Sequence, residues 1–261
     1  MLDENPGGSF RASEKSVREY LKGYIKTQGN NVKRYNFARK FVAGKKVVEL
    51  GCGFGAGGVL LDKYVTSYIG IDIDEEAIKY AKTYVAPLSN KLRYELLSES
   101  YNHVDDIQAD VGICYEVIEH VKEPEKLLTT LKRMVKQDGM IIVSTPNGLS
   151  SLGNKPLFRT PFHVNELSPN EFYELCSKFG NVMFFGERRI DMMDVKFLQR
   201  RLSEYLTKRR DEAATVSLWR SKLYDFAYNH FNGEIFWKIY PSTPEVEQKR
   251  LRSSTLLAII L

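Results

Sequence analysis

The sequence has 261 residues, 43% of them hydrophobic, which is enough for one large domain or one domain with an insertion. No apolar run approaches the ~20 residues of a membrane-spanning helix, and the first residues contain no apolar segment typical of a secretory signal. The three cysteines are widely spaced and odd in number, so they predict neither a disulfide framework nor a zinc site. We therefore expect a cytoplasmic protein.

The net charge of +5 is unevenly distributed along the chain. Residues 11–46 contain eleven Lys and Arg against two acidic residues, and residues 196–222 contain eight against three. Such segments favour an anionic partner: phosphate on a substrate, a nucleic acid or the surface of a membrane. The alternative interpretation is that they are solvated faces of helices.

In chain order, the hydrophobic pattern first predicts two helices and then a series of alternating strands and helices. The first helix starts at Ser13 and ends at Gly29-Asn30, and the second covers about Val32–Val42. Six short apolar runs predict strands: KKVVEL, YIGIDI, KLRYELL, ADVGICY, MIIVSTP and NVMFFGE. The predicted helices between them are Ala56–Tyr64, Glu75–Val85, Pro124–Lys136 with Gly139 at its exit, and Ser168–Phe179.

This alternation predicts an α/β fold, Rossmann-like, with a doubly wound and mostly parallel sheet covered by helices on both faces. The C-terminal STLLAIIL predicts one more strand. We expect residues 1–187 to form the core with its N-terminal helices and residues 253–261 to form its last strand. Residues 188–252, with a helical stripe of apolar side chains, are expected to form a helical insertion or cap over the substrate side.

A glycine loop and an acidic residue mark the ends of the first two predicted strands. Gly51, Gly53 and Gly55 directly follow the first strand, and Asp72 ends the second about twenty residues later. This pattern is typical of a dinucleotide or of S-adenosylmethionine, since glycines let the backbone approach a ligand and the carboxylate can bind ribose hydroxyls. Glu49, just before the loop, would repel a pyrophosphate but could meet a cationic methionyl group. The sequence therefore favours S-adenosylmethionine.

The segments VVELGCGFG, GIDIDEEAI and ADVGICYEVIEHV together resemble class I S-adenosylmethionine-dependent methyltransferases, and the resemblance covers roughly residues 32–187. It implies that Gly51, Gly53 and Gly55 lie beside the methionine part of the cofactor. The remaining cofactor residues that it implies are Asp72 and Ile73 at the ribose, Ser98 or Glu99 at the adenine, Tyr115 at the methionine, and Arg34 at the carboxylate. The alternative for Arg34 is a surface cation in a basic helix.

The stretch CYEVIEHV places three polar side chains at the end of the fourth predicted strand. Glu116, Glu119 and His120 have the spacing i, i+3, i+4, which would put them on one face of a helical turn. The stretch resembles CxExxEHV of ubiquinone-pathway, sugar and small-RNA 3′-terminal O-methyltransferases. In the ubiquinone and small-RNA groups these residues bind a divalent cation, and the small-RNA enzymes add a downstream histidine, for which His163 is the candidate here.

Mixed oxygen and nitrogen ligands suit manganese, iron or cobalt at least as well as magnesium, and we expect a divalent metal of the magnesium or manganese type. Four ligands would leave two octahedral positions for two neighbouring hydroxyls of a substrate, and His120 or His163 could accept the proton if it is not a ligand. The alternative is that Glu119 and His120 only orient the next helix, while His163 is an ordinary loop residue.

The segments RYNFARKFVAGKKVVELGCG, STPN and PFHVNELSPNEF most resemble methyltransferases of polysaccharide and glycolipid clusters. We therefore expect metal-assisted O-methylation in glycan biosynthesis, on an acceptor that is anionic or linked to a lipid or nucleotide, with peripheral contact to a membrane. A small-RNA 3′ end, a quinone or a catechol is the alternative acceptor. A binding protein that has kept only the cofactor fold is the alternative outside enzymes.

Overall fold

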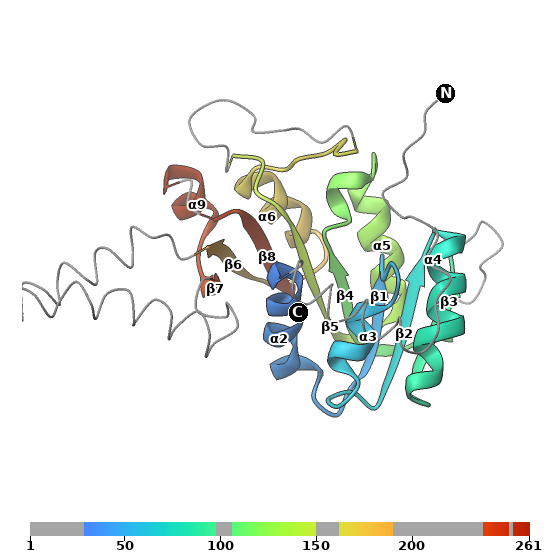
Figure 1. Ribbon diagram of the computed structural model, residues 1–261. Helices are drawn as coiled ribbons and strands as arrows, with labels where there is room; N and C mark the ends of the chain where they lie inside the picture. Colours follow the sequence, from blue (N-terminus) through green and yellow to red (C-terminus); the bar gives the residue numbers. More distant parts are fainter. Residues whose placement is uncertain (1–28, 98–105, 150–161, 190–236, 251–252) are drawn as a thin grey trace, which may run out of the picture. The chain divides into compact units, whose positions relative to one another are not determined.

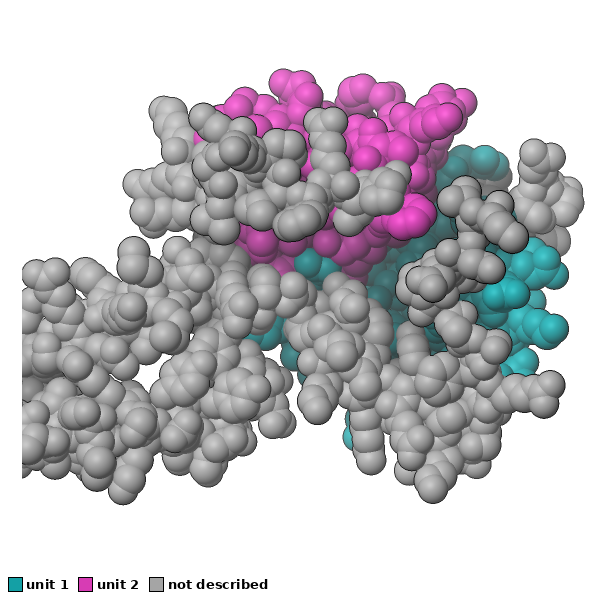
Figure 2. Space-filling view, turned by 45° about the horizontal axis from the view of Figure 1, so that its top comes forward, with its two compact units in different colours: residues 1–114, 130–140 teal, residues 115–129, 141–261 magenta. Residues whose placement is uncertain are grey.

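The structure, a computed structural model, describes residues 29–97, 106–149, 162–189, 237–250 and 253–261. The chain divides into two compact units, coloured separately in Figure 2. Unit 1 comprises residues 1–114 and 130–140, and unit 2 comprises residues 115–129 and 141–261.

Unit 1 is built on four parallel strands in the order β3-β2-β1-β4, which Figure 1 shows side by side. Their residues are largely apolar because the strands are buried, as is typical of parallel sheets. The registers Val48↔Ile69 and Val48↔Gly112 place β1 in the centre of this group. The strands are β1 (Lys46–Leu50), β2 (Ser67–Asp72), β3 (Leu92–Leu96) and β4 (Ala109–Tyr115, whose last residue belongs to unit 2).

The helices of unit 1 follow the strands as the sequence predicts, with local differences. Asp74 begins α4 by accepting hydrogen bonds from the backbone N–H groups of Glu76 and Ala77. Gly29 begins a helix rather than ending one, so the expected end of the first helix at this point is wrong; the rest of that helix lies outside the described residues. The helices are α2 (Gly29–Val42), α3 (Ala56–Leu61), α4 (Glu75–Tyr80), the π-helix η1 (Ala81–Val85) and the 3₁₀ helix η2 (Ala86–Leu88).

Unit 2 contains strands in the order β5-β8-β6-β7, with antiparallel pairing between neighbours. β8 has strands on both sides, and all six of its residues are buried, which explains its unbroken apolar sequence. The strands are β5 (Val135–Pro146, whose residues 135–140 belong to unit 1), β6 (Val182–Arg189), β7 (Trp237–Pro241) and β8 (Thr255–Ile260). β8 confirms the strand expected at the C-terminal end.

One helix of this part begins with a capping box. Ser168 and Glu171 form a reciprocal capping box at the start of α6, with Pro169 in its first turn. Gly139 lies within β5 instead of at a helix exit, because the preceding helix already ends at Met134. The helices are η4 (Ile118–His120), α5 (Pro124–Met134, whose residues 130–134 belong to unit 1), α6 (Pro169–Ser177) and α9 (Pro244–Arg250).

The range 188–252, expected to be a helical insertion, is only partly described. Its described part contains the helix α9 but also the strand β7, which the sequence pattern did not predict. Residues 190–236 and 251–252, including the apolar stripe, lie outside the described residues. Among the described helices, none has the length and apolar character that a membrane crossing requires.

Candidate functional site

The glycine loop of unit 1 connects the end of β1 to the start of α3. Gly51, Gly53 and Gly55 all have positive φ angles, of 83°, 50° and 88°. A side chain at Gly55 would lie 2.8 Å from the ring of Tyr94, whose hydroxyl donates to the Gly55 carbonyl at 3.0 Å. Tyr94 of β3 therefore fixes the loop through this hydrogen bond. The sequence analysis did not identify this residue.

Gly53 is different, because a Cβ built there would meet nothing within 4 Å. Its backbone N–H instead donates to Asp72 at 2.7 Å, and the other Asp72 oxygen accepts from the N–H of Asp74 at 3.0 Å. One carboxylate therefore fixes both the glycine loop and the turn after β2. The open space at Gly53 beside this carboxylate fits a ligand that approaches the backbone closely and offers hydroxyl groups.

Glu49 is buried in β1, with 1% of its surface exposed. Tyr35 donates a hydrogen bond to one of its carboxylate oxygens at 2.6 Å, and Tyr68 donates to the other. Burial raises the pKa of Glu49 from 4.5 to about 7, although the two tyrosine hydrogen bonds lower it; the charge of Asp72 adds a smaller increase. The sequence analysis identified the carboxylate but not the two tyrosines that hold it.

The other predicted cofactor residues lie in different surroundings. Arg34 of α2 is only 2% exposed, so the alternative of a surface cation is wrong. Ile73 is 77% exposed at the end of β2, as a residue that contacts a ligand would be. Tyr115 is buried at the end of β4 and belongs to unit 2. Glu99 lies outside the described residues, so its predicted contact with adenine stays a prediction.

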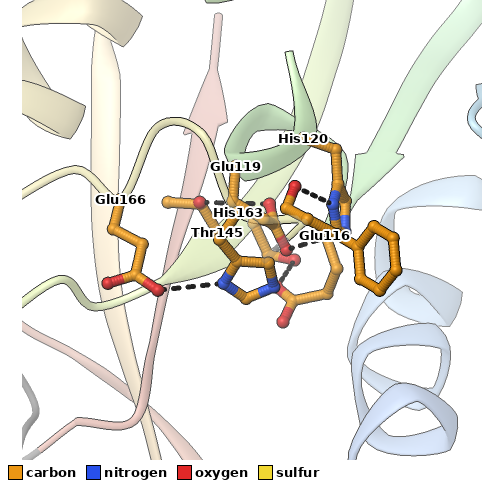
Figure 3. A network of polar contacts seen from close by, with 8 residues as sticks. Glu116, Glu119, His120, Thr145, His163 and Glu166 are labelled. Carbon is orange, nitrogen blue, oxygen red and sulfur yellow. Dashed lines mark hydrogen bonds and ion pairs between the residues drawn. The ribbon is translucent and has the colours of Figure 1, made fainter. Parts of the chain in front are cut away.

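Unit 2 brings together the side chains of Glu119, His120 and His163, which face one another in Figure 3. One potential ligand atom from each residue lies within 4.8 Å of those of the other two. The two imidazole rings meet edge to face, with centroids 5.0 Å apart, and His120 Nε2 is 3.9 Å from a Glu119 oxygen. A carboxylate and two imidazoles form a donor set that fits a divalent transition metal.

Both histidines of this cluster use Nδ1 for contacts outside it. His120 Nδ1 donates to the carbonyl oxygen of Phe162 at 3.1 Å, and His163 Nδ1 lies 3.0 Å from Glu166 Oε1. With Nδ1 bound in this way, Nε2 of each ring is the nitrogen that remains to accept a proton or a cation.

Glu116 takes a different position from the one expected, since Glu116, Glu119 and His120 do not share a helical turn. Glu116 has a φ angle of 54°, and the 3₁₀ turn begins only at Ile118. Its side chain accepts a hydrogen bond from Ser144 at 2.8 Å, and the described group of possible metal ligands does not include it. Its role as a ligand stays a prediction.

The loop that carries His163 is attached directly to the turn that carries Glu119. The backbone N–H groups of Val164 and Asn165 both donate to the carbonyl oxygen of Glu119, at 2.8 and 3.0 Å. Thr145, at the end of β5, donates to the Glu119 carboxylate at 3.3 Å. The buried carboxylate and its neighbouring loop are therefore positioned by protein contacts alone. The hydroxyl residues of the STP stretch and Glu166, three residues after His163, were signals that the sequence analysis did not use.

Comparisons with known proteins bear on the family and the fold. Residues 48–143 match the family model described as a methyltransferase domain. A probable S-adenosylmethionine-dependent methyltransferase of Mycolicibacterium smegmatis is 30% identical over 138 residues, which are 53% of this chain and 52% of the relative. A ubiquinone biosynthesis O-methyltransferase of Thiobacillus denitrificans is 35% identical over 118 residues, 44% of this chain and 50% of the relative. The chain thus spans about half the length of these curated relatives.

Solved structures share the fold over most of the chain. A possible histamine N-methyltransferase from Thermotoga maritima superposes with a TM-score of 0.57 at 14% identity, covering 95% of this chain and 96% of that one. The methyltransferase domain of bacterial CtHen1-C gives a TM-score of 0.51 at 20% identity, covering 88% and 96%. The α/β fold predicted from the sequence is therefore confirmed as that of class I methyltransferases, and residues 48–143 are similar to methyltransferase domains.

Proposed function

We propose that this protein is an S-adenosylmethionine-dependent O-methyltransferase in which Glu119, His120 and His163 hold a divalent cation that binds the acceptor. The observation that carries the proposal is the convergence of these three side chains, from two segments more than forty residues apart, at a buried carboxylate. A buried carboxylate is costly unless it is paired or binds a metal, so such a convergence needs a cause.

The glycine loop and Asp72 of unit 1 bind the cofactor in this proposal. The carboxylate of Asp72, already fixed by two backbone N–H groups, would accept hydrogen bonds from the ribose hydroxyls. Glu49 contributes negative charge near the methionyl end, and Arg34, Ile73 and Tyr115 complete the set carried over from the family resemblance. S-adenosylmethionine supplies the methyl group, which is transferred to the acceptor oxygen by direct displacement.

The histidine cluster of unit 2 serves the acceptor and not the cofactor. A divalent cation bound there supplies a Lewis acid that lowers the pKa of a hydroxyl and holds its oxygen, together with that of a neighbouring hydroxyl. In the absence of a cation, Nε2 of His120 or His163 can accept the hydroxyl proton, because Nδ1 of each ring is already bound.

The acceptor that we propose first is a sugar of a glycan with two neighbouring hydroxyls, carrying phosphate or linked to a lipid or nucleotide. The two basic segments of the sequence support an anionic acceptor. A quinone or catechol is the second candidate, favoured by the 35% identity to a ubiquinone biosynthesis O-methyltransferase. An RNA 3′ end, whose terminal ribose also has two neighbouring hydroxyls, uses the same cation chemistry.

The test is transfer of labelled methyl from S-adenosylmethionine to paired acceptors: sugars with their monodeoxy analogues, RNA with a normal or a 3′-deoxy end, and catechols with their single-hydroxyl analogues. We expect transfer to one class, with the member that lacks the neighbouring hydroxyl reacting at least about tenfold more slowly. Equal rates for both members of the active pair would contradict chelation of the acceptor. Failure of every acceptor, despite cofactor binding, would favour a binding protein.

A further inference from the structure

We propose that Glu166 is a positioning residue that fixes the tautomer and the orientation of His163; this inference rests on the proposed function of the histidine cluster. The starting observation is the contact between Glu166 Oε1 and His163 Nδ1 at 3.0 Å, with both side chains largely buried. In Figure 3, Glu166 approaches the His163 ring from the side away from His120.

This contact determines which ring nitrogen faces the cluster. A carboxylate accepts hydrogen bonds, so Nδ1 of His163 is the donor in this contact, and in the neutral ring the lone pair then lies on Nε2. A neutral imidazole without such a partner can carry its proton on either nitrogen, and the wrong tautomer would direct an N–H group at the site. A carboxylate on the far nitrogen also makes the near nitrogen a stronger donor to a cation.

The loop has other anchors, so Glu166 is not needed to hold its backbone. Val164 and Asn165 donate to the carbonyl of Glu119, and Gly148 donates to the carbonyl of Leu167 at 3.0 Å. Among the described residues, the side chain of Glu166 forms a polar contact with His163 only. The backbone carbonyl of Phe162 orients the ring of His120 in the same way. Because it belongs to the backbone, no substitution of a side chain can remove it.

The two histidines of the cluster are thus oriented by different means, and only one of them can be tested by a substitution. Glu166→Ala removes the acceptor, whereas Glu166→Gln keeps an amide oxygen that can accept from Nδ1–H without the charge. Glu174→Ala, which removes a carboxylate from an exposed position on α6, is the matched control for net charge.

The experiment is titration of the full chain with Mn²⁺, followed by electron paramagnetic resonance of the free ion. We expect the dissociation constant to rise 10- to 100-fold in Glu166→Ala, by less than about threefold in Glu166→Gln, and not at all in Glu174→Ala. Equal affinity of wild type and Glu166→Ala would overturn the proposal, as would equal losses in the Ala and Gln variants.

A second measurement keeps this inference separate from the proposed function. In metal-free protein with ¹⁵N-labelled histidine, NMR should show His163 as the Nδ1–H tautomer in wild type and in Glu166→Gln, and a shift toward Nε2–H in Glu166→Ala. Absence of Mn²⁺ binding by the wild type would contradict the cation site, whereas an unchanged tautomer in Glu166→Ala would contradict the role of Glu166. Thermal unfolding in chelator identifies a variant that has failed to fold.

Discussion

Two regions of the molecule are built in different ways. The glycine edge of unit 1 comprises the loop 51–55 and Asp72, and the histidine cluster of unit 2 comprises Glu119, His120 and His163. In the glycine edge the backbone forms the site: three residues with positive φ, and a carboxylate that binds two N–H groups. In the histidine cluster the backbone serves only as an anchor, and side chains from two distant segments provide the chemistry. A site made of backbone depends on a short continuous sequence, whereas a site made of side chains depends on how a loop returns to it.

This difference has a physical consequence for how each site responds to substitution. In the proposed function, removing one side chain from the cluster removes a metal ligand that the remaining groups cannot replace. Removing Asp72 from the glycine edge takes away two backbone contacts, but the three glycines with positive φ remain. We therefore expect substitutions in the cluster to lower turnover strongly. Substitutions in the glycine edge should weaken cofactor binding by smaller amounts that depend on the contact removed.

The largest expected effect is on turnover in the cluster. His163→Ala and Glu119→Ala should each lower kcat by at least about 100-fold, because each removes a group that holds the cation on the acceptor. Affinity for S-adenosylmethionine, measured by calorimetry, should change by less than about twofold. A parallel loss of cofactor affinity would show that the two sites do not have separate tasks.

The next effect concerns Glu49 and the pH dependence of stability. Its pKa is raised from 4.5 to about 7, so between these values the folded protein binds more protons than the unfolded chain. The unfolding free energy should therefore fall as pH rises through this window, by up to about 3 kcal/mol from this group. In Glu49→Gln this part of the fall should be absent. Urea unfolding at pH 5 and pH 8 gives the comparison, and identical pH slopes in both proteins would refute it.

A somewhat smaller effect is expected for Asp72 in the glycine edge. Asp72→Ala should weaken binding of S-adenosylmethionine by about 1.5–3 kcal/mol, because charge-assisted hydrogen bonds to the ribose and to the Gly53 N–H are both lost. Calorimetry on the folded variant measures this change, with Asp74→Ala as a control that removes a neighbouring carboxylate from the cap of α4. Unchanged affinity in Asp72→Ala would show that this carboxylate is structural.

The smallest effect is expected where β1 and β4 begin, at the end of these strands opposite to the glycine loop. Asp110 accepts hydrogen bonds from Lys136 Nζ at 2.6 Å and from the Lys46 N–H at 2.8 Å, and the Lys136 bond is the main reason that its pKa is lowered. Its contribution is present above the unfolded pKa of about 3.8 and is lost as pH falls below that value. Asp110→Asn should lower the unfolding free energy at pH 7 by less than about 1 kcal/mol, because the pair is partly exposed. A loss above 2 kcal/mol in urea unfolding would show a larger structural role.

Most of the strands could be predicted from the sequence, because buried parallel strands are short continuous apolar runs. β8 was visible for the same reason, since strands on both sides bury all of its residues. β7 was not predicted, because Trp237–Pro241 contains lysine and proline and pairs with a single neighbour, β6. Gly139 was predicted to mark a helix exit, because a glycine after a helical pattern is typical of a helix end. In the structure it lies within the long strand β5.

The sequence identified three residues that converge in unit 2 but not the contacts that position them. Glu119, His120 and His163 stood out because histidine is rare in this chain and two of its four residues fall in motifs. The predicted position of Glu116 was wrong. The spacing argument requires a helical turn at this residue, but the chain has a positive φ there. Tyr35 and Tyr68 gave no separate signal, because their roles depend on contacts with Glu49 that only the fold creates.

The most direct test of the account measures methyl transfer by the wild type to its best acceptor. Turnover is measured first in the presence of a chelator and again after a divalent metal has been added back. We expect turnover to fall at least about 100-fold in chelator, to return on addition of Mn²⁺, and to show no such return in His163→Ala, with S-adenosylmethionine affinity constant throughout. Full turnover in chelator would contradict the account, and would show that Glu119, His120 and His163 act without a cation.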